Sequence, residues 1–142
     1  MHKVYLGLGT NLGNKEQHLN DALAALSQQV GVVHKCSSFY RSKPEGFDSQ
    51  NEFLNAVAFV ETHLSPHELL HLTQDIEKQL GRTSKSTHGY TDRVIDIDIL
   101  IYDDVEVDTP DLKIPHPLMK QREFVMIPFL EISDRGERLA MI

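Results

Sequence analysis

Alternating apolar and polar residues predict four β-strands, at residues 3–9, 32–40, 55–62 and 94–102. In the first of them, Val4, Leu6 and Leu8 alternate with Tyr5 and with two glycines. The last has the strongest strand pattern, VIDIDILIY. We therefore expect a sheet with one well-buried face.

Two other segments carry apolar residues at helical spacing. The first spans residues 15–30. The second begins with Ser65 as N-cap, Pro66 in the first turn and Glu68 completing a capping box, and Gly81 ends it. The apolar stripes consist of Leu19, Ala22, Leu23, Leu26 and Val30 in the first helix, and of Leu69, Leu72, Thr73, Ile76 and Leu80 in the second.

The predicted elements follow the order β-α-β-β-α-β. This order is typical of the split βαβ, ferredoxin-like arrangement, an α+β fold in which two helices pack on one face of an antiparallel sheet. The other face of the sheet would then be open. We expect ligand sites on that face and on the loops.

The connecting segments are polar or rich in proline. Residues 41–53, which include Pro44, Gly46 and Asp48, predict a long loop, and residues 82–92 (RTSKSTHGYTD) predict a mobile one. A turn at residues 103–104 predicts that residues 105–108 pair with the last strand. Prolines at positions 110, 115, 117 and 128 predict irregular or short helical structure beyond it.

Length and composition indicate one domain over residues 1–142. The chain carries 14 Lys and Arg against 21 Asp and Glu, a net charge of −7, which disfavours nucleic acid as a partner. Its single cysteine, Cys36, excludes an intrachain disulfide and favours a reducing cytoplasm. No apolar run approaches the ~18 residues of a membrane span, and the N-terminus lacks a signal-peptide pattern.

Asp96 and Asp98 are the strongest chemical signal. Residues two apart in a strand point to the same face, so the two carboxylates would stand together while Ile95, Ile97 and Ile99 point into the core. Two adjacent carboxylates with no Cys or His in the cluster favour Mg²⁺, which completes its shell with phosphates and water. The alternative is the solvated face of an amphipathic strand, but Asp is a poor strand former.

Cationic side chains flank this pair along the chain. Arg82, Lys85, His88 and Arg93 lie in or beside the predicted mobile loop, a set that suits phosphoryl transfer, although each could be an ordinary surface charge. The segment IPHPLMKQREF adds His116, Lys120, Arg122 and Phe124 in a proline-constrained turn. GLGTNLG fails the G-x-G-x-x-G register, and we interpret it as a turn that allows close backbone approach.

Five motifs occur in a fixed order and together cover nearly the whole chain: GLGTNLGN, SSFYRSKPEGFDSQNEFLNAV, IEKQLGR, DRVIDIDIL and IPHPLMKQREF. This ordered set resembles the 6-hydroxymethyl-7,8-dihydropterin pyrophosphokinase family. The resemblance implies a ferredoxin-like fold and transfer of the β,γ-diphosphate of ATP to the hydroxymethyl group of the pterin, with release of AMP. It also implies two Mg²⁺ ions and a role in tetrahydrofolate biosynthesis. We expect a cytoplasmic monomer that needs no membrane or nucleic acid.

The resemblance also assigns roles to residues of this chain. Asp96 and Asp98 resemble the metal-binding aspartates, and with Arg82 and Arg93 they form the implied catalytic set. The implied pterin-binding residues are Pro44, Gly46, Phe47, Phe53, Asn55 and Phe124. The implied ATP-binding residues are Gln74, Glu77, Arg82, Lys85, Arg93, Ile99, His116 and Arg122.

The side-chain chemistry of two residues suits the pterin contacts that the resemblance implies for them. The Asn55 amide offers the heterocycle both a donor and an acceptor. Phe124 would stack on one pterin face, with Phe47 or the backbone of Glu45 and Gly46 on the other. Phe53 stands where the family often has Tyr.

The basic loop departs from the family pattern G-R-x-R-x-x-R-W-G-P-R. This chain has GRTSKSTHGYTDR, two residues longer between the first and last Arg. Ser84 with Lys85 replaces the second Arg, and His88 and Tyr90 stand near the third Arg and the Trp. Because Lys is a point charge and not a bidentate fork, we expect the electrostatics of this loop to differ.

Other functions fit parts of this pattern. A nonenzymatic ligand-binding or regulatory module would need only the sheet and helices, and would show no requirement for metal and ATP. A nucleotidyltransferase or another small-molecule kinase could use the same carboxylate pair, and ADP as product would identify ordinary phosphoryl transfer. An RNA-binding sheet is disfavoured by the net charge of −7 and by the lack of an aromatic RNP-like motif.

Overall fold

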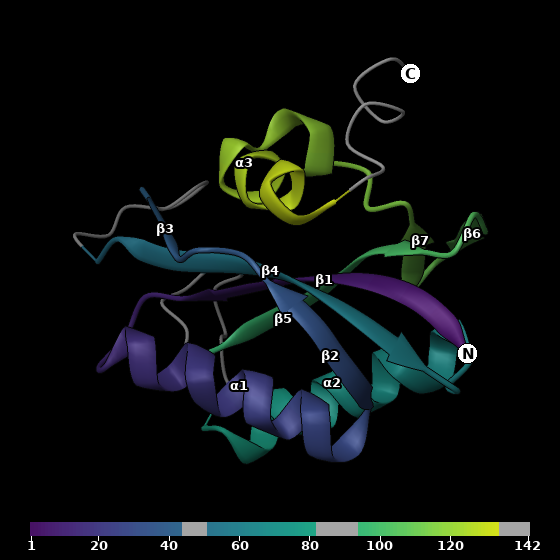
Figure 1. Cartoon of the computed structure of the whole chain (residues 1–142), viewed down its shortest axis with the longest axis horizontal. Coiled ribbons are helices and arrows are strands. Elements are labelled where there is room, and N and C mark those ends of the chain that lie inside the picture. Colours follow the sequence, from purple (N-terminus) through teal and green to yellow (C-terminus); the bar gives the residue numbers. More distant parts are fainter. Residues whose placement is uncertain (44–50, 82–93, 134–142) are drawn as a thin grey trace.

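The computed structural model describes residues 1–43, 51–81 and 94–133, which form an antiparallel sheet with helices on both faces (Figure 1). The strands of this sheet are β1 (His2–Thr10), β2 (Gly31–Cys36), β3 (Tyr40–Ser42), β4 (Phe53–Thr62) and β5 (Asp96–Tyr102). Their order is β2-β4-β1-β5, with β3 also paired to β4. The long strands β1 and β4 therefore form the centre, and β5 is an edge strand.

Two helices cover one face of the sheet, as the sequence predicts (Figure 1). They are α1 (Lys15–Gln29) and α2 (Pro66–Gln79). The Ser65–Glu68 capping box is present at the start of α2. Leu19 and Leu26 of α1 and Leu69 and Ile76 of α2 are completely buried in the main core against this face. Burial of such side chains contributes about 1.5–3 kcal/mol each to the stability of the sheet–helix packing.

The opposite face is only partly open, which corrects the prediction. Helix α3 (Glu123–Ile132) packs on it after the short 3₁₀ turn η1 (Met119–Gln121) (Figure 1). Phe129 of α3 is fully buried, and its ring meets Tyr5 of β1 edge-on at 5.0 Å between centroids. Pro128 lies inside α3 and does not break it. Burial of the apolar face of α3 offsets the single hydrogen bond that a proline removes.

The predicted strand at residues 32–40 is interrupted. Ser37 N–H donates to Val57 O, and Ser37 Oγ accepts from Val57 N, both at 2.9 Å. The next residue, Ser38, donates from N and Oγ to Glu131 Oε2 at 2.8 and 3.0 Å, which ties this bend to α3. These polar contacts replace the regular ladder, so the segment forms β2 and β3 with a bend between them.

The second correction concerns residues 105–108, which do not pair with β5. Strand β6 (Val107–Thr109) pairs with β7 (Leu112–Ile114) in a separate hairpin. Thr109 Oγ1 donates to Asp111 Oδ1 at 2.8 Å and stabilises the hairpin turn. The predicted turn at residues 103–104 is present, with Val105 N donating to Tyr102 O at 3.1 Å, but it does not bring the following residues back against β5.

Asp103 instead ties the end of β5 to the start of β1. Its φ of +48° is a left-handed conformation, which Asp tolerates better than most residues. Its carboxylate accepts from Lys3 N at 2.7 Å and from His2 Nδ1 at 2.8 Å. Burial raises the pKa of Asp103, but the hydrogen bonds from Lys3 and His2 outweigh it, so the net shift is downward.

None of the described helices is long and apolar enough to span a membrane.

We predict that Asp103→Ala lowers the free energy of unfolding by about 1–2 kcal/mol at pH 7, because it removes both hydrogen bonds and puts a β-carbon without polar groups in the left-handed region. Asp103→Asn keeps an acceptor and should lose less. Because the folded state depresses this carboxyl pKa, the stabilisation is present above the unfolded value of 3.8 and is lost as the pH falls through the folded value. Urea unfolding at neutral and acidic pH tests this, and equal losses in both variants at neutral pH would contradict it.

Candidate functional site

The two carboxylates predicted from sequence stand on one face of β5. Asp96 and Asp98 are both partly exposed, whereas Ile97 between them is 6% exposed and belongs to the main core. The alternation that predicted this arrangement is confirmed. The carboxylates lie on the same side of the sheet as α3, opposite to α1 and α2.

Glycines of β1 lie directly beside the two carboxylates. In the antiparallel register, Gly9 is paired with Asp96 and Gly7 with Asp98. Paired residues share a face of the sheet, so no β1 side chain stands next to the carboxylates. The two glycines form a strip of backbone that has no side chains of its own, bordered by β5 on one side and β4 on the other. We call this strip the β1 hollow.

Asn55 forms the opposite border of the β1 hollow. It pairs with Gly9 on one side and with Tyr40 on the other, so one row of the sheet runs from Asp96 through Gly9 to Asn55. Its Nδ2 donates to Tyr40 O and Ser42 Oγ, both at 2.9 Å. These two bonds fix the amide orientation of a side chain that is only 4% exposed.

Phe53 lies two residues before Asn55 on the same strand. A β-carbon added at Gly9 would be 3.2 Å from Asn55 Oδ1 and 3.6 Å from Phe53 Cδ1. Both side chains therefore reach over the glycine. Gly9 is the position at which a side chain would fill the β1 hollow.

The segment after β7 is attached to β5 by its backbone. His116 N donates to Leu100 O at 2.9 Å, which places this segment at the edge of the sheet. The Arg122 guanidinium carbon lies 5.5 Å from the centroid of the Phe124 ring, a cation–π contact. His116, Arg122 and Phe124 are all half-buried.

His116 is neutral in this environment. Its Nδ1 accepts a hydrogen bond from Leu118 N at 3.2 Å, which requires an unprotonated Nδ1 and leaves the ring proton on Nε2. Burial is the main reason why the pKa of His116 is lowered, and the Arg122 charge lowers it further, whereas Asp96 acts in the opposite direction. His116 therefore interacts electrostatically with both a carboxylate of β5 and the cation of Arg122.

Three of the predicted ATP-binding residues lie apart from this group. Gln74 is exposed on α2, and Ile99 is 5% exposed and packed in the core on the far face of β5. Glu77 of α2 is also 5% exposed, and its Oε2 accepts from Ile97 N at 2.7 Å. The structure therefore places Glu77 against the backbone of the carboxylate-bearing segment.

The remaining predicted site residues lie outside the described residues. They are Pro44, Glu45, Gly46 and Phe47 of the first long loop and Arg82, Lys85, His88 and Arg93 of the basic segment. Their roles stay predictions.

Sequence reasoning missed Gly7 and Gly9. It assigned GLGTNLG to a turn, but β1 extends to Thr10, and the turn comes afterwards, with Gly13 at φ +66°. The sequence did contain a signal for this arrangement. Gly7 and Gly9 are two residues apart, as are Asp96 and Asp98. Only the strand register shows that these two pairs are neighbours.

The carboxylates of Asp96 and Asp98 suit a cation that binds few protein ligands. Within residues 1–43, 51–81 and 94–133, no group of three or more His, Cys, Asp or Glu side chains gathers at one point. The pair on β5 alone therefore fits Mg²⁺, which commonly binds one or two carboxylates and completes its octahedron with phosphates and water. It does not fit a structural Zn²⁺ site, which needs four protein ligands.

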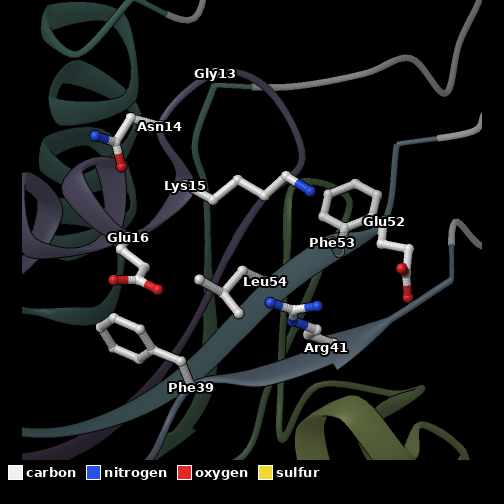
Figure 2. Close-up of a pocket in the computed structure, with 9 residues that line it drawn as sticks. All are labelled: Gly13, Asn14, Lys15, Glu16, Phe39, Arg41, Glu52, Phe53 and Leu54. Carbon is white, nitrogen blue, oxygen red and sulfur yellow. The ribbon is translucent and has the colours of Figure 1, made fainter.

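A pocket of about 510 Å³ lies beside the β1 hollow, between the start of α1 and strands β3 and β4 (Figure 2). Figure 2 shows the side chains of Lys15 and Arg41 between the rings of Phe39 and Phe53. Of the residues that border the β1 hollow, Phe53 is the one that also lines this pocket. The pocket therefore adjoins the carboxylate site without containing it.

Comparison with known proteins gives a consistent result. The family model for 7,8-dihydro-6-hydroxymethylpterin-pyrophosphokinase matches residues 5–134. A 2-amino-4-hydroxy-6-hydroxymethyldihydropteridine pyrophosphokinase of Porphyromonas gingivalis is 47% identical over 132 residues, covering 92% of this chain and 90% of that protein. The enzyme of the same name from Bacillus subtilis is 42% identical over 138 residues, covering 96% of this chain and 81% of that protein.

Solved structures agree on the fold. Plasmodium falciparum HPPK-DHPS wild type superposes with a TM-score of 0.72 at 15% sequence identity, over 92% of this chain and 41% of that chain. The chain thus spans less than half of that two-part protein, and the similarity concerns the fold.

We predict that Arg122→Met raises the pKa of His116 and that Asp96→Asn lowers it, because each variant removes one of two opposing charges. NMR titration of the His116 ring measures both shifts, with the ring of exposed His63 as an internal reference. Shifts in the same direction, or no shift in either variant, would contradict the arrangement.

Proposed function

The chain belongs to the 7,8-dihydro-6-hydroxymethylpterin-pyrophosphokinase family and transfers the pyrophosphoryl group of ATP to hydroxymethyldihydropterin in folate biosynthesis, and we propose that this reaction takes place over the β1 hollow. The observation that carries this proposal is the row from Asp96 through Gly9 to Asn55. It puts a pair of carboxylates and a fixed amide on one face of the sheet, separated by a residue without a side chain.

We propose that Asp96 and Asp98 hold two Mg²⁺ ions together with the phosphates of ATP. When bound, Mg²⁺ supplies neutralising charge to the phosphate oxygens and keeps attacking and leaving oxygens in line. The chain contributes the rigid placement of the two carboxylates on β5. Gly7 and Gly9 put no β1 side chain beside these carboxylates.

The pterin then occupies the Asn55 side of the β1 hollow. Because Nδ2 of Asn55 is engaged by Tyr40 and Ser42, its Oδ1 is oriented as an acceptor for an N–H of the heterocycle. Phe53 and Phe124 offer aromatic surface for the ring. We assign the second pterin face to Pro44, Gly46 and Phe47, as expected from the sequence.

Cations complete the phosphate side of the site. We assign the His116 Nε2–H and the Arg122 guanidinium as donors to phosphate oxygens, together with Arg82, Lys85 and Arg93 as expected from the sequence. We assign Gln74 and the β5 edge at Ile99 to the border of the nucleotide. Placing the pterin hydroxyl in line with the β-phosphorus supplies most of the barrier reduction, so no strong protein base is required. The products are the pterin diphosphate and AMP.

We also propose that residues 1–142 act as a single domain, as a monomer in the cytoplasm. The single main core between the sheet and helices α1 and α2 supports one folding unit.

We predict that Asp98→Ala and Asp96→Ala each reduce AMP formation from ATP and the pterin by more than about 100-fold in a folded protein, because each removes a carboxylate from the cation site. The measurement is pterin-dependent AMP release in the presence of Mg²⁺. Glu106→Ala is the matched control, since it removes one exposed carboxylate beyond the far end of β5. Near-normal activity of Asp98→Ala would overturn the assignment.

We predict that Gly9→Ala raises the KM for the pterin by about 10-fold or more and changes the KM for ATP much less. The added β-carbon would lie 3.2 Å from Asn55 Oδ1, so the amide that reads the pterin would have to move. Steady-state kinetics with each substrate varied in turn separate the two effects. An unchanged pterin KM in a correctly folded variant would place the pterin elsewhere.

A further inference from the structure

We propose that Glu77 is a positioning residue that holds the carboxylate pair of β5 in register from behind the strand. This inference rests on the proposed function, because it takes Asp96 and Asp98 as the cation site. It assigns Glu77 a role through the backbone, and not as a contact to the nucleotide.

The geometry is a short hydrogen bond at the centre of the pair. Glu77 Oε2 accepts from the backbone N–H of Ile97 at 2.7 Å. Ile97 is the single residue between Asp96 and Asp98. The bonded N–H belongs to the peptide between Asp96 and Ile97, so the bond holds the backbone directly after Asp96 and directly before Asp98.

An edge strand needs such a partner. Strand β5 has β1 on one side, and the bond to Glu77 shows that the Ile97 N–H is directed away from β1. Outward N–H groups of an edge strand have no strand to pair with, and a buried one without a partner is costly. A carboxylate acceptor gives a charge-assisted bond, roughly twice as strong as a neutral one.

The position of the pair at the beginning of β5 makes this bond more important. Asp96 is the first residue of the strand, and Gly9, its partner on β1, has no side chain to pack against it. No β1 side chain therefore packs against Asp96. The Ile97 side chain in the core and the Ile97 N–H on Glu77 are the two anchors next to it.

Glu77 itself is rigidly held. Its neighbours on the same buried stripe of α2, Thr73 and Ile76, are 1% and 0% exposed. Helix α2 packs on the face of the sheet opposite to the carboxylates, and no group of three metal-ligating side chains forms among the described residues. Glu77 thus acts on the cation site through β5 and is not a third ligand.

Two conservative variants separate the hydrogen bond from the charge. Glu77→Gln keeps an oxygen acceptor at the same reach but removes the charge. Glu77→Asp keeps the charge, but its side chain is one methylene shorter and does not reach Ile97 N. Binding of Mn²⁺, measured by electron paramagnetic resonance with a nonhydrolysable ATP analogue, and amide hydrogen exchange at Ile97 are the two measurements.

We expect Glu77→Asp to weaken Mn²⁺ binding about 10- to 100-fold, the range typical for residues that orient metal ligands, and to accelerate exchange of the Ile97 amide. We expect Glu77→Gln to stay within about 3-fold of the parent protein in Mn²⁺ affinity. Unchanged Mn²⁺ affinity of Glu77→Asp despite faster exchange would reduce the bond to a purely structural role and overturn the proposal. An equal loss of Mn²⁺ affinity in Glu77→Gln would overturn the proposal, because the charge of Glu77 and not its hydrogen bond would then be responsible.

Asp98→Ala distinguishes this proposal from the one on which it rests. If Asp98→Ala keeps full Mn²⁺ affinity, the cation site itself is wrong. If Asp98→Ala loses Mn²⁺ while Glu77→Asp keeps it, the cation site stands and the role of Glu77 fails. If Glu77→Asp does not fold, the Mn²⁺ affinity and Ile97 exchange of Glu77→Gln alone still test whether an acceptor at this reach is sufficient.

Discussion

The antiparallel pairing of β5 with β1 is the constraint on which the site depends. A strand alternates its side chains, so a shift of the register by one residue would turn Asp96 and Asp98 into the core. The observed register instead puts the carboxylates beside Gly9 and Gly7, which have no side chains. The apolar residues Ile95, Ile97 and Ile99 favour it over a one-residue shift, because that shift would take them out of the core.

The two faces of the sheet have different roles. One face is apolar and is covered by α1 and α2, which supplies the main core. The other carries a smaller apolar cluster under α3, around Tyr5 and Phe129, next to the polar row that runs from Asp96 to Asn55. Because the main core contains buried residues of all three long strands, part of the second face is able to carry charged and small residues that would be unfavourable in a core.

Local patterns were sufficient to predict most of this arrangement. Capping at Ser65, helical spacing in both main helices and alternation around Asp96 and Asp98 depend on neighbours in sequence, and the structure confirms them. What could not be predicted depends on distant partners. The break at Ser37 results from its hydrogen bonds to Val57. The helix continues through Pro128 because it packs on the sheet. The role of Gly9 depends on its register with Asp96.

The residues that make the β1 hollow weaken the strands that contain them. Glycine lowers strand stability through backbone entropy, and Asp is among the poorest strand formers. The glycines of the central strand β1 lie beside the Asp residues at the beginning of the edge strand β5, so the β5 segment needs support from outside the sheet. Ile97 in the core and the buried carboxylate of Glu77 on its N–H provide that support from the face opposite to the ligands. A polar site on one face of the sheet is thus compatible with a fixed backbone, because the hydrogen bond that holds the β5 backbone comes from Glu77 on the opposite face.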